Sequence, residues 1–275
     1  MTPTLAYFGH HKAASTWLGD ITRELSRAAG LAYASVHSPR KFDGDLAAFV
    51  SSRRVEFLSY VNANRRYVST LGDFRAFHVI RDPRDIIVSS YFSHLHTHPT
   101  DDWPELIEHR RELQQTDEER GMYIVMDFLQ DVLDDIATWD YSDHRILELK
   151  MEDVVRAPEE TLVRAFSFLG LVDSDQPLLR REVARGLAAV NRRTSRVSIR
   201  ALPLPASVAT ASLGRNAFAL KSNGRAPGVE SVSSHYRKGV PGDWVNHFSS
   251  GHIRRFKERY GPQLVRLGYE SDLDW

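Results

Sequence analysis

Short apolar runs alternate with longer segments of helical periodicity, and this alternation limits the possible folds more than any other feature. Strand–helix alternation is typical of a mostly parallel sheet covered by helices on both faces. We therefore predict an α/β fold with a central, mostly parallel sheet flanked by helices, whose ligands bind beyond the carboxyl ends of the strands. The predicted strands are residues 5–8, 33–36, 55–59, 77–80 and 146–149, and the predicted helices are 16–29, 84–92, 118–137, 159–169, 176–190 and 251–267.

One segment interrupts the alternation. Residues 191–234 are rich in Arg, Ser, Ala, Gly and Pro, with few apolar residues at any period. A connection of that length is too long to be an ordinary loop. We predict a single domain over residues 1–275, with a lid at about 191–234 that partly orders on a ligand.

Charge and residue types exclude several classes of protein. The 36 basic residues balance the 36 acidic ones, which argues against a general nucleic-acid binder. No cysteine is present, so disulfides, thiolate catalysis and cysteine metal sites are excluded, and we find no convincing metal cluster. Neither a signal-peptide pattern nor a run of membrane-spanning length occurs. We expect a cytoplasmic protein with no metal, no membrane span and no nucleic-acid partner; its oligomeric state stays open.

The turn between the first predicted strand and its helix has the composition of a phosphate site. Helix N-termini bind anions through their first N–H groups. Ala13 and Ala14 allow close approach of the backbone, Lys12 adds a positive charge, and Ser15 and Thr16 add hydroxyl donors. The alternative is an ordinary helix cap with a solvated lysine. A Walker A loop would need Gly-Lys-Ser or Gly-Lys-Thr, which this turn lacks.

Two further segments carry cations that suit an anionic ligand. Arg81 follows a predicted strand, ahead of a helix that opens at Asp82-Pro83, and Ser89 lies about two helical turns further on. The triplet Arg237-Lys238-Gly239 combines two cations with a glycine that an anion can approach. Each has an ordinary alternative: Arg81 pairs with Asp82 or Asp85, and the triplet is a surface basic pair.

Taken in order, these motifs resemble the sulfotransferases that use 3′-phosphoadenosine 5′-phosphosulfate (PAPS). The segment His11-Lys12-Ala13-Ala14-Ser15-Thr16-Trp17 is similar to that family's Pro-Lys-Ser-Gly-Thr-Thr-Trp loop. Arg81 and Ser89 have its spacing, and residues 237–248 are close to its C-terminal signature. The resemblance covers essentially the whole chain and implies the P-loop-like sulfotransferase fold.

The resemblance also implies roles for these residues. Lys12 and the amides of the following turn, Ala13 to Thr16, would hold the 5′-phosphosulfate. The 3′-phosphate would be held by Arg81, Ser89, Arg237, Lys238 and Gly239, and adenine would lie between Trp17 and Phe218. The activity implied is in-line transfer of the sulfuryl group from PAPS to a hydroxyl, or less readily an amine, of a small-molecule, glycan or lipid acceptor, leaving PAP. The residues that shape the acceptor site are expected in 97–113 and 191–234.

The general base is the missing part of the resemblance. The stretch where the cytosolic branch has a histidine, residues 57–63, contains none. We favour His37, which ends the second predicted strand, with His11 as the second choice. His94, His96 and His98 are expected on an exposed loop. Two rival functions remain: a PAP-binding module without catalysis, and an ATP-dependent small-molecule kinase, for which no magnesium carboxylate is apparent.

Overall fold

The computed structural model describes residues 3–173 and 203–275, which group into two compact units. The first, which we call the sheet unit, comprises Met1–His10, Ala14–Ile80 and Asp140–Ala217. The second, the helical unit, comprises His11–Ala13, Arg81–Trp139 and Phe218–Trp275. The helix predicted at 176–190 and the first part of the predicted lid, 191–202, lie outside the described residues.

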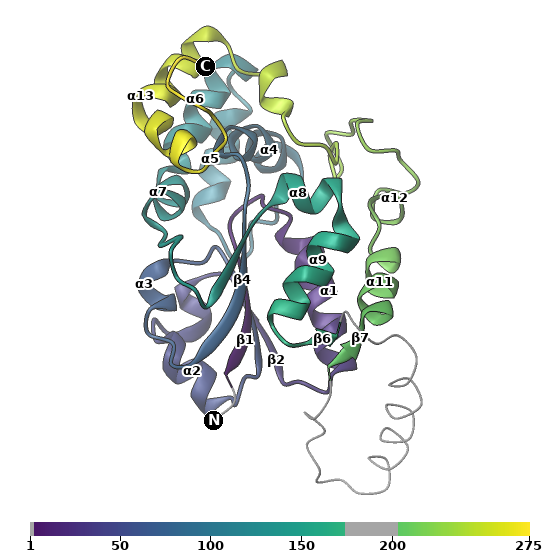
Figure 1. Cartoon of the computed structure of the whole chain (residues 1–275). Coiled ribbons are helices and arrows are strands. Elements are labelled where there is room, and N and C mark those ends of the chain that lie inside the picture. The colour runs from purple at the N-terminus through teal and green to yellow at the C-terminus, as the bar shows by residue number, and fades with distance from the viewer. Residues whose placement is uncertain (1–2, 174–202) are drawn as a thin grey trace, which may run out of the picture. The chain divides into compact units, whose positions relative to one another are not determined.

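The sheet unit is built on five parallel strands in the order β2-β3-β1-β4-β5. Figure 1 labels β1, β2 and β4 of this sheet. They are β1 (Thr4–Gly9), β2 (Tyr33–Val36), β3 (Phe57–Val61), β4 (Phe74–Ile80) and β5 (Ile146–Lys150). One face packs on α1 (Ser15–Ala28), α9 (Pro158–Phe168) and α11 (Ala206–Arg215), whose buried side chains share one core with the strands. The predicted α/β class with a parallel sheet is confirmed.

Shorter elements complete this unit. They are η1 (Pro39–Phe42), α2 (Leu46–Ser52), α3 (Arg65–Val68), α8 (Met151–Arg156) and the paired strands β6 (Val172–Asp173) and β7 (Leu204–Pro205). Helix α11 falls inside the segment that sequence periodicity left without regular structure. Its Ala209 and Leu213 are buried in the core, and Ser212 and Asn216 donate side-chain hydrogen bonds to Glu24 of α1. This part of the predicted lid is therefore a packed helix, and movement of the segment stays a prediction.

In the helical unit, α5, α6 and η2 contact α4 (Pro83–His96), whose first turn Asp82 caps. The remaining elements are α5 (Glu105–Leu113), α6 (Glu118–Phe128), α7 (Gln130–Thr138), α12 (Phe218–Lys221), η2 (Asp243–Asn246) and α13 (Ser250–Arg266). The single helix predicted at 118–137 is thus two helices, which meet at Leu129. Among the described residues, no helix combines the length and apolar composition that crossing a bilayer requires.

Arg84 anchors the C-terminal part of the helical unit on α4. Its guanidinium donates to Asp82 Oδ2 at 2.7 Å and pairs with Glu270. It also lies 3.9 Å from the ring centroid of Trp244 and 4.5 Å from that of Trp275. A buried arginine needs partners on all sides, and here two carboxylates and two indole faces supply them.

Candidate functional site

The two predicted phosphate-binding cations Lys12 and Arg81 meet in the helical unit. Arg81 follows β4 directly, is buried, and donates from Nη1 to the carbonyl oxygen of Lys12 at 3.0 Å. Lys12 itself has a left-handed backbone, with φ of 58°. A non-glycine residue in that region is strained, and such strain gathers at ligand sites.

The electrostatics around Lys12 and Arg81 suit an anionic ligand. The pKa of Lys12 falls from 10.5 to about 7, because the ammonium is buried and because Arg81 and Arg237 lie nearby. Arg81 Nε is buried and has no hydrogen-bond partner among the described residues. Crowded cations with an unsatisfied buried donor are stabilised by a bound anion. The donor set therefore fits a phosphate or sulfate group.

The triplet Arg237-Lys238-Gly239 is held by one carboxylate. Arg237 Nη2 and Lys238 Nζ each donate to Asp243 at 2.5 Å, and Arg237 also pairs with Glu230. Burial alone would raise the pKa of Asp243, but hydrogen bonds from Lys238, Asn246 and Arg237 hold it well below its usual range. The sequence alternative of a solvated basic pair is wrong, because both cations are enclosed and paired.

Asp85 joins this triplet to α4 and to Arg81. Its carboxylate accepts from the backbone N–H of Gly242 at 2.7 Å and of Trp244 at 3.0 Å. The same carboxylate lies 3.6 Å from Arg81 Nη2. The expected pairing of Arg81 with an acidic neighbour is thus present, and the same carboxylate holds the loop at Gly242. Sequence reasoning did not identify Asp85 as this link, since Gly242 and Trp244 lie more than 150 positions away.

Position 239 requires a glycine. Its φ is +71°, and a Cβ there would lie 2.4 Å from the Phe218 ring. Phe218 therefore packs against the triplet, and its ring centroid lies 6.4 Å from that of Tyr236. Its contact with adenine stays a prediction. Ser89 is half-buried on α4.

The other predicted contacts lie at the start of α1, in the sheet unit. Ala14 is the N-cap, with φ of 58° and no side-chain hydrogen bond. Ser15 and Thr16 occupy the first turn, so the alternative that one of these hydroxyls caps the helix is wrong. Trp17 is half-buried against the core, and its Nε1 has no partner among the described residues.

The two histidines predicted as bases have different surroundings. His11 is buried, and its Nε2 lies 2.9 Å from Nε2 of His94. Burial, with Lys12 and His98 nearby, holds the pKa of His11 well below 6.5. His37 is half-buried directly after β2, and its carbonyl oxygen accepts a hydrogen bond from Asn62 at 3.3 Å.

The expectation of an exposed histidine loop is wrong for His94. This side chain is fully buried in α4, among the rings of His11, His98, Trp103, His109 and Phe128. The error arose because alternate histidines suggested an extended loop, whereas α4 continues to His96. His235, one residue from Tyr236, was also missed: burial, with Lys12 and His98 nearby, lowers its pKa to about 4.

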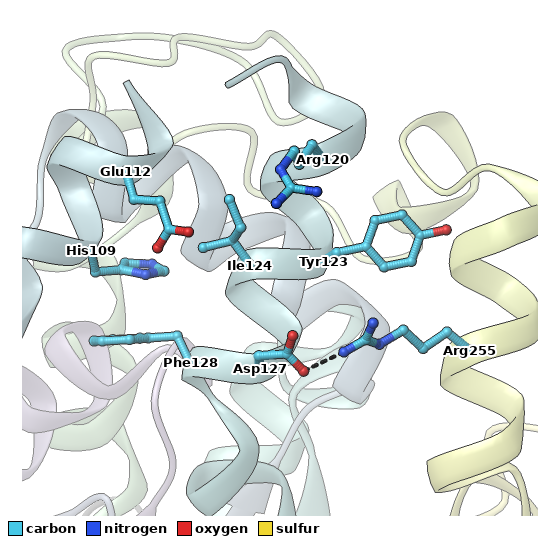
Figure 2. A pocket seen from close by; sticks show the side chains of 8 residues that line it. All are labelled: His109, Glu112, Arg120, Tyr123, Ile124, Asp127, Phe128 and Arg255. Carbon is cyan, nitrogen blue, oxygen red and sulfur yellow. Dashed lines mark hydrogen bonds and ion pairs between the residues drawn. The ribbon is translucent and has the colours of Figure 1, made fainter. Parts of the chain in front are cut away.

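A pocket of about 550 Å³ lies among α5, α6 and α13 (Figure 2). His109 stacks on Phe128 with 3.8 Å between ring centroids, and Asp127 pairs with Arg255 across the pocket. His109 and Glu112 belong to the segment 97–113, in which acceptor-shaping residues are predicted. The lining consists of His109, Glu112, Arg120, Tyr123, Ile124, Asp127, Phe128 and Arg255.

One group of potential metal ligands occurs among the described residues. Ligand atoms of Glu230, Asp243 and His247 lie within 4.8 Å of one another. Arg237 pairs with both carboxylates, and Lys238 pairs with Asp243 as well. We interpret the group as a salt-bridge cluster.

The sheet unit defines an α/β protein, and the cation cluster around Lys12 in the helical unit suits an anionic ligand. A family model described as the sulfotransferase family matches residues 5–175. The chain belongs to that family. No match was found among the curated proteins compared.

Solved structures agree with the fold. One is a mouse sulfotransferase, SULT7A1, complexed with PAP: the TM-score is 0.55 and the identity 16%, over 96% of this chain and 85% of that one. Another is a retinol dehydratase in complex with androsterone and inactive cofactor PAP, with a TM-score of 0.50, 13% identity, and coverage of 96% and 81%. At these identities the likeness concerns the fold alone.

Proposed function

We propose that the protein transfers the sulfuryl group from PAPS to a hydroxyl of a small-molecule, glycan or lipid acceptor, and less readily to an amine. The observation that carries this proposal is the cluster of Lys12, Arg237 and the buried Arg81, with the unsatisfied Arg81 Nε and the lowered Lys12 pKa. Membership of the sulfotransferase family and the two structural neighbours complexed with PAP support the same ligand.

Each binding residue has a stated task in this proposal. Lys12 and the backbone from Ala13 to Thr16 hold the 5′-phosphosulfate. Phe218 and Trp17 contact adenine. The 3′-phosphate is held by Arg81, Ser89, Arg237, Lys238 and Gly239, and it competes with Asp243 for the two triplet cations.

Bound PAPS supplies the sulfuryl group, and negative charge grows on its bridging phosphate oxygen during transfer. Lys12 stabilises that charge, which lowers the barrier more than it strengthens ground-state binding. The charged form is needed for this, and bound anionic groups raise the pKa of Lys12 again by cancelling the repulsion from Arg81 and Arg237.

The proton of the acceptor requires a base, and His37 and His11 are the candidates from the sequence. His11 shares the helical unit with Lys12 and touches His94. Replacing the true base by alanine should lower kcat by roughly a hundredfold with PAP affinity kept. Unchanged turnover of both His37→Ala and His11→Ala would assign the task to another group.

The decisive experiment combines binding with transfer. Calorimetry with PAP and an acceptor screen with sulfur-labelled PAPS are run on the wild type, on Arg81→Ala and on the exposed control Arg156→Ala. Loss of PAP binding in Arg81→Ala alone, with labelled product from the wild type, supports the proposal. PAP binding without any product favours a binding module, and transfer from ATP that a chelator abolishes favours a kinase.

A further inference from the structure

Arg237 shares its guanidinium between two carboxylates. Nη1 donates to Glu230, and Nη2 donates to Asp243 at 2.5 Å. One face of the group lies on Phe92, with 4.6 Å between its central carbon and the ring centroid, and the Arg237 side chain is 10% exposed. The protein's own groups therefore already occupy both terminal nitrogens of a cation that is assigned above to the 3′-phosphate.

The two carboxylates differ in how firmly they are held. The Asp243 side chain is 1% exposed, and it also accepts hydrogen bonds from Lys238 Nζ at 2.5 Å and from Asn246 Nδ2 at 2.9 Å. The Glu230 side chain is 36% exposed, and within the described part of the chain its carboxylate pairs with Arg237 alone. Asp243 is thus fixed in the framework of the triplet, whereas the Glu230 side chain can turn into solvent.

The backbone around Glu230 is tied to the triplet. The backbone N–H of Ser231 donates to the carbonyl oxygen of Arg237 at 2.9 Å. Arg225 Nη1 donates to the carbonyl oxygens of Val229 at 2.9 Å and of Arg237 at 2.8 Å. All of these residues belong to the helical unit. The Glu230 carboxylate can therefore leave Arg237 and return to it by rotation of its side chain, without movement of the loop.

Repulsion favours that departure when an anion binds. Carboxylate oxygens of Glu230 and Asp243 lie within 4.8 Å of each other. Like charges this close repel, and their shared partner Arg237 supplies the compensating positive charge. A phosphate at the same guanidinium is a third anion, so it binds most favourably when one carboxylate withdraws. Glu230 is the one that can withdraw, because Asp243 is buried and held by further donors.

We propose that Glu230 is a displaceable counter-ion of Arg237 that sets how tightly the protein holds a nucleotide 3′-phosphate. This inference rests on the proposed function, and it adds to that function a means of releasing PAP. When the 3′-phosphate binds, the Glu230 carboxylate turns into solvent, and when PAP leaves, the carboxylate pairs with Arg237 again. Asp243 and Phe92 keep the guanidinium in place throughout.

The effect should be confined to nucleotides that carry a 3′-phosphate. Adenosine 5′-phosphate lacks this group, so it has nothing to place on Arg237 and leaves the Glu230 pair intact. Removing the Glu230 charge should therefore strengthen the binding of PAP and leave that of adenosine 5′-phosphate nearly unchanged. A residue that only supports the local structure would change both affinities together.

Calorimetric titration with the two nucleotides tests this difference. In Glu230→Gln we expect PAP to bind about three- to tenfold more tightly than in the wild type, and adenosine 5′-phosphate within about twofold of it. Glu118→Gln is the matched control: Glu118 is also exposed, but it pairs with His247. This variant should leave both affinities within about twofold of the wild type. Glu230→Asp keeps the charge and should stay closer to the wild type than Glu230→Gln.

Release kinetics give a second measurement. Most of the gain in Glu230→Gln should appear as slower dissociation of PAP in stopped-flow displacement. A folded Glu230→Gln that binds PAP no more tightly than the wild type would overturn the inference, and so would an equal gain for both nucleotides. A wild type that binds neither nucleotide would instead refute the proposed function.

Discussion

Replacing Lys12 by methionine should abolish transfer and yet stabilise the ligand-free protein. The Lys12 ammonium is buried beside Arg81 and Arg237, which lowers its pKa from 10.5 to about 7. Methionine keeps the volume of the side chain and removes the charge. Loss of a group that stabilises the transition state should cost about 10²–10³ in kcat.

The gain in stability follows from the lowered pKa. A fall from 10.5 to about 7 corresponds to roughly 5 kcal/mol, at about 1.36 kcal/mol for each pKa unit. The side chain keeps part of its surface in water, so we expect about 1–3 kcal/mol, or several degrees in Tm for a chain of this size.

The pH dependence supplies a sharper test. Below pH 7, Lys12 is charged in both the folded and the unfolded protein, so the folded wild type carries the full cost of burying that charge. Between pH 7 and 10.5 the unfolded chain binds one proton more than the folded protein, so wild-type stability rises with pH and the advantage of Lys12→Met shrinks.

Denaturant unfolding of the ligand-free protein at pH 6.5 and pH 9.5 measures the difference. The exposed Lys41→Met serves as the matched control and should change stability little at either pH. A Lys12→Met protein that is no more stable than the wild type at pH 6.5, or whose advantage persists at pH 9.5, would refute this reasoning.

Three further outcomes follow from the site. Gly239→Ala should weaken PAP binding at least tenfold in calorimetry, because its Cβ would meet the Phe218 ring at 2.4 Å and its φ is +71°; equal affinity would show that this packing is unimportant. Asp243→Asn should destabilise the protein near neutral pH and flatten the dependence of its stability on acid pH. A carboxylate whose pKa is lowered on folding stabilises the protein above its ordinary pKa of 3.8 and loses that contribution as pH falls. An unchanged pH dependence would contradict the pairing. Arg84→Met should cost about 3–5 kcal/mol in denaturant unfolding, because it removes the guanidinium that pairs with the buried Asp82 carboxylate and lies against two indoles, and a loss below 1 kcal/mol would argue against the anchor.

The parallel sheet could be predicted because its strands are short apolar runs that alternate with segments of helical periodicity. This pattern is visible in the local sequence. The five strands lie within three residues of their predicted positions. Helix α11 was missed because its packing depends on Glu24, which is distant in sequence. Leu129, where the predicted long helix divides, is an ordinary helix former and gives no sign of a break.

The candidate site could likewise be predicted only in part. Lys12 and Arg81 could be paired from their positions after β1 and β4, since adjacent parallel strands end at one edge. The role of Asp243 could not be predicted, because a carboxylate directly after Pro241-Gly242 is typical of a turn. The side-chain contacts of His78 with Glu148 and with His10 also escaped detection, since they depend on the register of β1, β4 and β5 rather than on spacing along one strand.

The fluorescence of the Trp244 indole should report ligand binding without an added label. Its backbone N–H is fixed to Asp85, Asp85 lies beside Arg81, and Arg81 donates to Lys12, all within the helical unit. An anion that draws Arg81 away from Asp85 alters the field at this fluorophore, which already faces the Arg84 guanidinium. Emission during a titration with PAP should therefore change in the wild type, and a Trp244→Phe variant should lose the part of that change that comes from this indole while binding continues.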